Sequence, residues 1–194
     1  MSPGKLVLLI GPSGVGKSVV LKKLRAMEPE LHFPLSATTR PRRPREGDEL
    51  YHFLTDAEFD ASLKDGKFLE WAQVHGGPRY GTLIDEILPA IDAGKTVVRE
   101  VDVQGFDSIR NHPLFAAPSP RYRLISLFLL PESVDQLIAH ITKRAPMEQE
   151  ELKRRLRSME RELGYAEFCT HRITSHEGKL DDVVREAAEI IRRS

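Results

Sequence analysis

The stretch that decides the fold is Gly11-Pro12-Ser13-Gly14-Val15-Gly16-Lys17-Ser18, which fits the pattern G-x-x-x-x-G-K-[ST]. The short apolar run at 6–10 precedes it and is too brief for a core helix, so it predicts a buried parallel strand. Residues 17–27 repeat apolar side chains at helical spacing. The pattern therefore lies between a strand and a helix, the context in which it forms a phosphate-binding loop.

The residue types in this loop suit the binding of a phosphate chain. Glycines let the backbone turn tightly and bring N–H groups against phosphate oxygens, and the N-terminus of the next helix adds partial positive charge. The Lys17 ammonium would reach the terminal phosphates, and the Ser18 hydroxyl would ligate Mg²⁺. A glycine-rich turn with a solvated lysine is the plain alternative.

Composition limits what the rest of the chain can be. Its 194 residues can bury one substantial core with smaller lobes and need no disulfides. Lysine plus arginine equals aspartate plus glutamate, at 29 each, so no overall basic field favours nucleic acid. The single cysteine fits a reducing compartment, and no apolar run approaches the ~20 residues of a membrane span. We expect a cytoplasmic protein that binds neither nucleic acid nor membranes, and the histidine spacing predicts no zinc site.

Residues 31–36 are predicted to form a second strand, and an arginine-rich loop follows it. Prolines and charges in residues 37–51 are incompatible with a regular helix. Guanidinium groups bind phosphate in a bidentate fashion, and this loop carries Arg40, Arg42, Arg43 and Arg45. We expect a second anionic group to bind here, and a solvated charge run is the alternative.

A small mixed region then interrupts the alternation of strands and helices. Short strands are predicted at 51–54 and 67–74, with a helix over 56–63 that Thr55 caps. This region has the features of an inserted substrate lobe. Thr82 is predicted to cap a further helix that runs through Ala93 and is closed by Gly94.

Glu100 and Asp102 stand at the carboxyl end of a core strand predicted over 96–101. Because they are two positions apart, they should share one face of the strand, at the edge where an open α/β sheet binds ligands. A carboxylate beside the phosphate loop can hold Mg²⁺ or its water shell. A helix-capping or turn role is the alternative for Asp102.

The C-terminal part is predicted to contain two more strands and three helices. A loop over 111–122 precedes a strand at 124–130, helices at 131–141 and 148–165, a strand at 171–174 and an amphipathic helix at 180–193. The basic kink at 142–146 could form a mobile lid over the phosphates or an ordinary turn. Acidic neighbours at helical spacing favour a solvated ion-pair face for most of Arg154, Arg155 and Arg157.

Taken together, these motifs resemble the guanylate kinase family over nearly the whole chain. Besides residues 11–18, the likeness is carried by Ser36-Ala-Thr-Thr-Arg40-x-x-Arg43, Tyr51-His-Phe53, Phe68-Leu-Glu70-Trp-Ala, Tyr80-Gly81 and Val101-Asp-Val-Gln-Gly105. The phosphate loop alone indicates only a superfamily, and the later motifs select the family. The chain departs from the family pattern at several positions, among them Arg45 at a usual glycine and Glu100 at a usual aspartate.

The resemblance implies a P-loop NTPase three-layer α/β fold with a five-stranded parallel core sheet, a small mixed GMP-binding lobe and a helical lid. A single domain would comprise a core at 1–36, 83–136 and 160–194, the lobe at 37–82 and the lid at 137–159. The implied reaction is Mg²⁺-dependent transfer of the ATP γ-phosphoryl group to GMP, giving ADP and GDP, by a monomer or homodimer. The alternatives are a kinase of this fold with another phosphorylated small molecule as acceptor, and a noncatalytic interaction domain, against which the intact phosphate loop argues.

The resemblance also implies roles for individual residues. The ATP phosphates would lie on Gly11, Pro12, Ser13, Gly14, Val15, Gly16, Lys17 and Ser18. Guanine would be read by Ser36, Glu70 and Thr82, and the GMP phosphate held by Arg40, Arg43, Tyr51 and Tyr80. Glu100 and Asp102 would organise the magnesium and substrate side, with the metal at Ser18 and, through water, at Asp102. The catalytic set would be Lys17, Arg40, Asp102 and the lid-side arginines Arg144 and Arg155, and His140 and Thr142 fall where a further lid arginine is often found.

Overall fold

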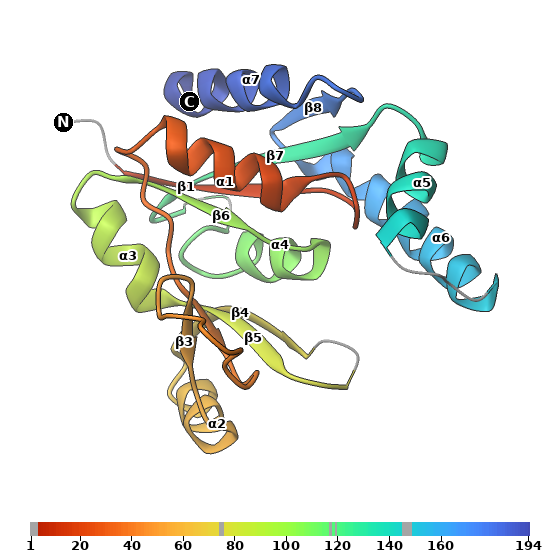
Figure 1. The fold of residues 1–194 in the computed structure, drawn as a ribbon. Coiled ribbons are helices and arrows are strands. Elements are labelled where there is room, and N and C mark those ends of the chain that lie inside the picture. The colour runs from red at the N-terminus through yellow and green to blue at the C-terminus, as the bar shows by residue number, and fades with distance from the viewer. Residues whose placement is uncertain (1–3, 74–75, 117, 119, 145–148) are drawn as a thin grey trace. The chain divides into compact units, whose positions relative to one another are not determined.

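A computed structural model describes residues 4–73, 76–116, 118, 120–144 and 149–194 of the chain (Figure 1). The chain divides into two compact units. The first comprises Met1–Leu6, Glu30–Arg99 and Gln104–Leu124, and the second Val7–Pro29, Glu100–Val103 and Ile125–Ser194.

The second unit contains the phosphate loop. The buried strand β1 (Lys5–Ile10) leads through the loop into α1 (Lys17–Met27). Strands β7 (Arg123–Pro131) and β8 (His171–Ser175) pair in parallel. The helices are α5 (Val134–Arg144), α6 (Gln149–Gly164), the short 3₁₀ helix η1 (Tyr165–Phe168) and α7 (Leu180–Arg193).

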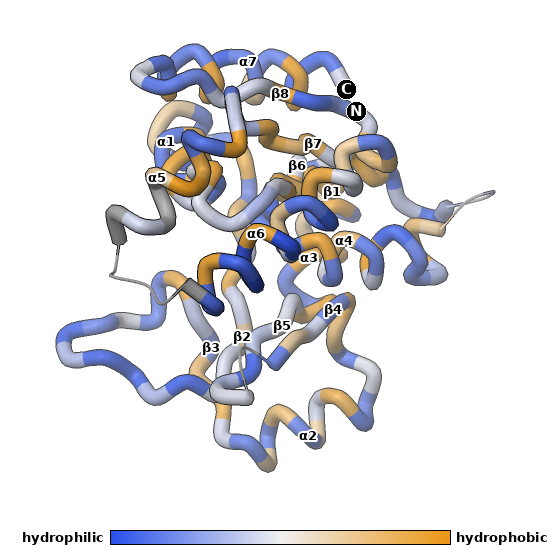
Figure 2. Tube along the Cα trace, turned by 90° about the vertical axis from the view of Figure 1, so that its right-hand side faces the viewer, coloured by the Kyte–Doolittle hydropathy of each residue, from blue (hydrophilic) through white to orange (hydrophobic). Residues whose placement is uncertain are grey.

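Helix α7 packs against α1 through one apolar face. Figure 2 shows hydrophobic and hydrophilic residues alternating along α7. The buried residues of this helix are Val183, Val184, Ala187, Ala188 and Ile191. Ion pairs join Lys23 to Asp181 and Arg192 to Glu28 at the edges of this contact. None of the helices in the described part of the chain has the length and hydropathy needed to span a bilayer.

The parallel sheet has the strand order β6-β1-β7-β8, where β6 is Thr96–Glu100. Among the described residues it therefore has four strands, whereas five were expected. The predicted strand over 31–36 does not form: residues 31–35 contribute only an isolated parallel bridge between His32 and Val97, and Ser36 begins a strand of the other sheet. Pro34 explains this, because it has no N–H to donate to a neighbouring strand.

The first unit is built around a mixed sheet with the order β3-β2-β5-β4. Its strands are β2 (Ser36–Thr38), β3 (Tyr51–Phe53), β4 (Phe68–Gln73) and β5 (Arg79–Leu83). Only the β2–β3 pair is parallel. Helix α2 (Asp56–Lys64) covers this sheet with Phe59, whose ring stacks on Phe68 at 4.5 Å. The predicted cap is confirmed, because Thr55 and Glu58 form a capping box.

Two helices complete this part of the chain. Helix α3 (Ile84–Asp92) begins after Leu83, so the prediction that Thr82 caps it is wrong. Thr82 lies buried in β5, and its hydroxyl donates a hydrogen bond to the Glu70 carboxylate. Gly94 does close the helix, with φ of 80°. Helix α4 (Val103–Arg110) was not expected from the sequence.

Candidate active site

The phosphate loop has the backbone shape that its glycines were expected to allow. Gly16 precedes α1 with φ of 102°, a left-handed conformation in which other residues are strained. A Cβ atom on Gly11 would lie 2.7 Å from the Leu129 carbonyl oxygen on β7, so this position has no room for a side chain. The loop thus lies tightly against the sheet at the carboxyl end of β1.

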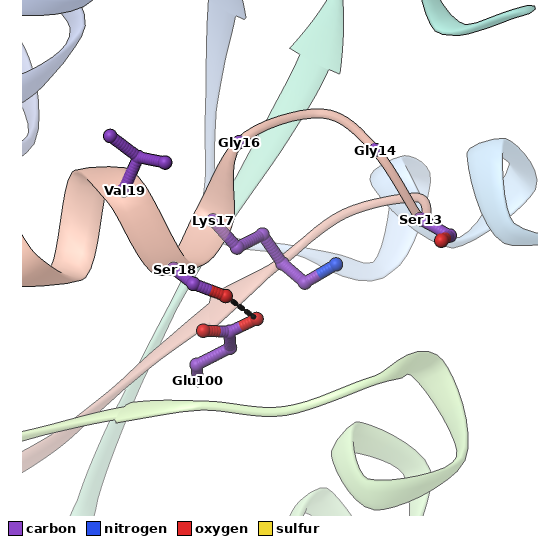
Figure 3. A pocket seen from close by; sticks show the side chains of 7 residues that line it. All are labelled: Ser13, Gly14, Gly16, Lys17, Ser18, Val19 and Glu100. Atoms are coloured by element: carbon purple, nitrogen blue, oxygen red, sulfur yellow. Dashed lines mark hydrogen bonds between the residues drawn. The ribbon is translucent and has the colours of Figure 1, made fainter. Parts of the chain in front are cut away.

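A pocket of about 150 Å³ opens on this loop (Figure 3), lined by Ser13, Gly14, Gly16, Lys17, Ser18, Val19 and Glu100. The Lys17 ammonium donates to the carbonyl oxygens of Gly11 at 2.7 Å and Pro12 at 3.2 Å. It is therefore held over the loop, where the phosphates of a nucleotide are expected to bind. The pocket combines a fixed cation with a helix N-terminus, which suits an anionic ligand.

Ser18 and Glu100 provide oxygen ligands on one side of this pocket. The Ser18 hydroxyl donates to Oε1 of Glu100 over 3.1 Å, as Figure 3 shows. The backbone N–H of Val101 donates to the Leu9 carbonyl at 3.2 Å, which positions the end of β6 beside β1. A hydroxyl and a carboxylate are hard oxygen ligands of the kind that Mg²⁺ prefers, so these residues fit the expected ion.

Asp102 is placed differently from the prediction. Strand β6 ends at Glu100, and Asp102 lies exposed immediately before α4, so the two carboxylates do not share one face of a strand. The carboxylate that reaches Ser18 is that of Glu100. The register of the strand end decides this, and a strand end is the part of a strand that sequence patterns locate least well.

A further carboxylate, which the sequence did not indicate, also contacts the loop. The backbone N–H of Ser13 donates to Oε2 of Glu162 on α6 at 3.1 Å, and the Ser158 hydroxyl donates to the other oxygen at 2.9 Å. The Ser13 N–H thus already binds an anionic oxygen. A phosphate oxygen would need the same kind of donor.

The residues expected to read guanine lie together in the first unit. Glu70 on β4 stands opposite Thr82 on β5, and the Thr82 hydroxyl donates to Oε1 of Glu70. Arg99 on β6 donates from Nη1 to the Ser36 hydroxyl oxygen at 2.6 Å, and its Nη2 lies 3.9 Å from Oε1 of Glu70. Arg99 was not singled out from the sequence, although an arginine within the core strand predicted over 96–101 was a signal.

The residues expected to hold the GMP phosphate also lie close to one another. The Arg40 guanidinium donates to both carboxylate oxygens of Glu46, at 3.0 and 2.6 Å, and lies 5.3 Å from the centre of the Tyr51 ring. The centres of the Tyr51 and Tyr80 rings are 6.2 Å apart. Glu46, another residue that the sequence did not indicate, accepts a further hydrogen bond from the Arg43 N–H at 2.9 Å. Arg40 therefore already binds a carboxylate in the bidentate manner expected for a phosphate.

The same loop carries a strained residue. Arg45 has φ of 64°, at the position where the family usually has glycine. A residue with a Cβ is costly in this left-handed region. Its neighbour Glu46 has its pKa lowered to about 2, first by the hydrogen bonds from the Arg40 side chain and then by the Arg43 N–H.

We expect this ion pair to stabilise the protein in a pH-dependent way. Because the pKa of Glu46 falls from 4.5 to about 2 on folding, its contribution is complete above 4.5 and is lost as the pH falls through about 2. The free energy of unfolding of Glu46→Gln should therefore lie below that of the wild type at pH 6, and the gap should close towards pH 2. Urea unfolding of both proteins across this range measures the gap, with Glu49→Gln as the control. A gap that stays constant down to pH 2 would contradict a charge-based role.

The two lid-side arginines lie on α5 and α6. Arg155 forms an ion pair with Glu151, one helical turn away at 2.7 Å, and its side chain is 44% exposed. Arg144 ends α5, and its side chain lies outside the described residues, as do residues 145–148 of the predicted kink. In this conformation Arg155 has the solvated ion-pair arrangement that was the alternative for these arginines.

The glycine-rich loop joins a buried parallel strand to a helix. Lys17 lies over it, and the hydrogen-bonded pair Ser18 and Glu100 lies beside it. These features place the protein in the P-loop class of phosphate-binding α/β proteins. The comparisons with known proteins narrow this class. The family model described as guanylate kinase matches residues 3–194. The chain belongs to the guanylate kinase family.

Several relatives support this membership. The chain is 46% identical to the guanylate kinase of Nocardia farcinica over 162 residues, which cover 82% of this chain and 80% of the relative. It is 38% identical to that of Leifsonia xyli subsp. xyli over 187 residues, covering 96% and 70%. The crystal structure of guanylate kinase from Anaplasma phagocytophilum aligns with a TM-score of 0.69 at 24% identity, over 99% of this chain and 86% of that one. The latter likeness concerns the fold alone.

Proposed function

We propose that this member of the family is an ATP:GMP phosphotransferase that moves the γ-phosphoryl group of ATP to GMP, with Mg²⁺, and releases ADP and GDP. The observation that carries the proposal is the largely buried carboxylate of Glu70, held by Thr82 and accompanied by Ser36 and Arg99. In a family of nucleotide kinases, such a polar cluster is suited to one particular base edge. The phosphate loop supports the donor half of the reaction.

For the donor half, the ATP phosphates would lie on the loop formed by residues 11–18, against the backbone N–H groups of its residues other than Pro12, and would replace Glu162 at the Ser13 N–H. Lys17 would then exchange its bonds to the loop carbonyls for bonds to the β- and γ-phosphates. Ser18 and Glu100 would hold Mg²⁺, and exposed Asp102 would act on its water shell. When bound, the ion neutralises charge that develops on the phosphates.

For the acceptor half, Arg40 and Arg43 would bind the GMP phosphate, together with Tyr51 and Tyr80. The phosphate would take the place that Glu46 now holds on the Arg40 guanidinium. A phosphate oxygen of GMP is already an anionic nucleophile, so this chain need not supply a general base. Positioning and charge neutralisation provide most of the acceleration in such reactions.

The lid arginines provide a test of the closed state. We expect Arg144→Ala and Arg155→Ala each to lower kcat more than they raise KM for GMP, because their contacts would form mainly around the transferring phosphoryl group. Steady-state kinetics measure the split, and Arg154→Ala, at an exposed position next to Arg155 on α6, serves as the control. If both variants changed only KM, these arginines would belong to the solvated helix face.

One assay tests the proposed function itself. Coupled measurement of ADP formation with GMP, IMP, AMP, CMP and UMP as acceptors should give turnover chiefly with GMP and a requirement for Mg²⁺. Preference for a different acceptor would favour the first alternative, a kinase of this fold with another phosphorylated substrate. No turnover by folded protein with any acceptor would favour a noncatalytic interaction domain.

The division into core 1–36, 83–136 and 160–194, lobe 37–82 and lid 137–159 remains a prediction, as do the cytoplasmic location and the monomeric or homodimeric state.

A further inference from the structure

Arg99 is a largely buried arginine of the first unit. It stands on a core strand, its side chain is only 14% exposed, and it reaches two of the residues expected to read guanine. A charged group with so little access to water costs free energy unless it is paired. Its partner is the Glu70 carboxylate, which is itself only 10% exposed and lies 3.9 Å from Nη2.

We propose that Arg99 is a specificity-determining residue of the base pocket, which sets the hydrogen-bonding direction of Ser36 and holds Glu70 so that a 6-oxo, 2-amino purine is accepted and a 6-amino purine is rejected. This inference rests on the proposed function, since it names how the same site selects its substrate. Arg99 acts through Ser36 and Glu70, so it is a positioning residue.

Arg99 sets the direction of the Ser36 hydroxyl. A guanidinium has only N–H donors, so the Ser36 oxygen must be the acceptor in the 2.6 Å contact with Nη1. The positive charge then directs the hydroxyl proton away from Arg99. Ser36 can offer this proton to an acceptor such as the O6 atom of guanine, whereas the 6-amino group of adenine is itself a donor.

Arg99 also helps to hold the Glu70 carboxylate. Oε1 already accepts the Thr82 hydroxyl proton, and the Arg99 guanidinium lies on the same side of the carboxylate. Together these two groups fix the carboxylate plane and balance its charge in a site with little water. The N1–H and 2-amino donors of guanine are then matched by an acceptor-only group. Arg99 thus couples the reading of position 6 to the reading of positions 1 and 2.

The competing explanation is structural, because Arg99 also ties β6 to β2 through Ser36. A merely structural role predicts that losing Arg99 lowers activity with every acceptor by a similar factor. The specificity role predicts a loss confined to acceptors that carry a 6-oxo group. The ratio between acceptors therefore separates the two explanations, whereas the absolute activity does not.

The experiment compares wild type, Arg99→Met and Arg99→Lys with GMP, IMP and AMP as acceptors. IMP keeps the 6-oxo group and N1–H and lacks only the 2-amino group. We expect Arg99→Met to lower kcat/KM by about tenfold to a hundredfold for both GMP and IMP, the range for lost hydrogen bonds to charged groups. Activity with AMP should stay level or rise. Arg99→Lys, which keeps the charge and a donor, should recover part of the loss and provides a milder substitution where Arg99→Met folds poorly.

Two further variants sharpen the assignment. Arg79→Met removes an arginine whose side chain is equally buried, 14% exposed, and which pairs with Asp56 and Asp60 on α2. It should lower the melting temperature and leave the GMP/AMP ratio unchanged. Ser36→Ala added to Arg99→Met should cost little more GMP activity than Arg99→Met alone, because both changes remove the same directed hydroxyl.

The outcomes separate this inference from the function on which it rests. A folded wild-type protein that does not phosphorylate GMP overturns the proposed function and this inference with it. A wild type that phosphorylates GMP, with an Arg99→Met variant that loses the same factor with GMP, IMP and AMP, overturns only the inference. An unchanged GMP/AMP ratio in both Arg99 variants does so as well.

Discussion

Lys17→Ala is expected to lower kcat by about a hundredfold or more and to leave the fold intact, because the side chain contributes charge at the phosphate pocket and little to the core. Its ammonium donates to the carbonyl oxygens of Gly11 and Pro12, and both acceptors belong to the loop itself. The alanine variant therefore keeps the backbone donors for ATP and loses the cation that stabilises the transferring phosphoryl group.

Lys22→Ala is the matched control for this variant. Lys22 is exposed on the same helix, so its replacement removes the same charge from α1 outside the pocket. It should keep near-normal kcat, and the melting temperatures of both variants should lie close to that of the wild type. Near-normal turnover by a folded Lys17→Ala protein would contradict the assignment as a kinase.

The elements that the sequence predicted best are those whose boundaries depend on local signals. The helices over 17–27 and 180–193 agree with α1 and α7 to the residue, because helical spacing and flanking residues define both. The strand predicted over 31–36 is wrong, because the choice of sheet depends on pairing partners and not on apolar content. Ser36–Thr38 instead pairs with β3 and β5.

In the site, too, residues of a contiguous motif were predicted and residues that act through long-range contacts were missed. The phosphate loop is a contiguous motif, and its glycines, Lys17 and Ser18 are where the pattern placed them. Glu46, Arg99 and Glu162 were missed, because their importance comes from contacts made in the folded chain. The Arg99–Ser36 bond joins residues 63 positions apart, and the Ser13–Glu162 bond joins residues 149 apart. No spacing rule relates such pairs, so a single sequence could offer only a charge in an apolar strand as a clue to Arg99.

The largest expected effect on substrate preference concerns Glu70. In a wild-type protein that reads guanine with this carboxylate, GMP should be preferred over AMP by a factor of about 10⁴, since a site built around polar pairs is left unsatisfied by an analogue that lacks them. Guanine offers N1–H and the 2-amino group as adjacent donors, whereas adenine has an acceptor at N1 and no 2-amino group. IMP, which lacks only the 2-amino donor, should be used poorly.

Glu70→Gln should narrow the gap between GMP and AMP chiefly by losing activity with GMP. The amide oxygen of the substituted side chain would still accept from the Thr82 hydroxyl, as Oε1 of Glu70 does now, which turns the NH₂ group towards the base. That group is a donor, so it opposes the two donors of guanine, and the Arg99 guanidinium loses its counter-charge. Competition between GMP and AMP in one coupled assay measures the ratio, with Glu49→Gln as a control on an exposed carboxylate. A wild type that prefers AMP, or a Glu70→Gln protein that keeps the full GMP preference, would mean that the base is read by other residues.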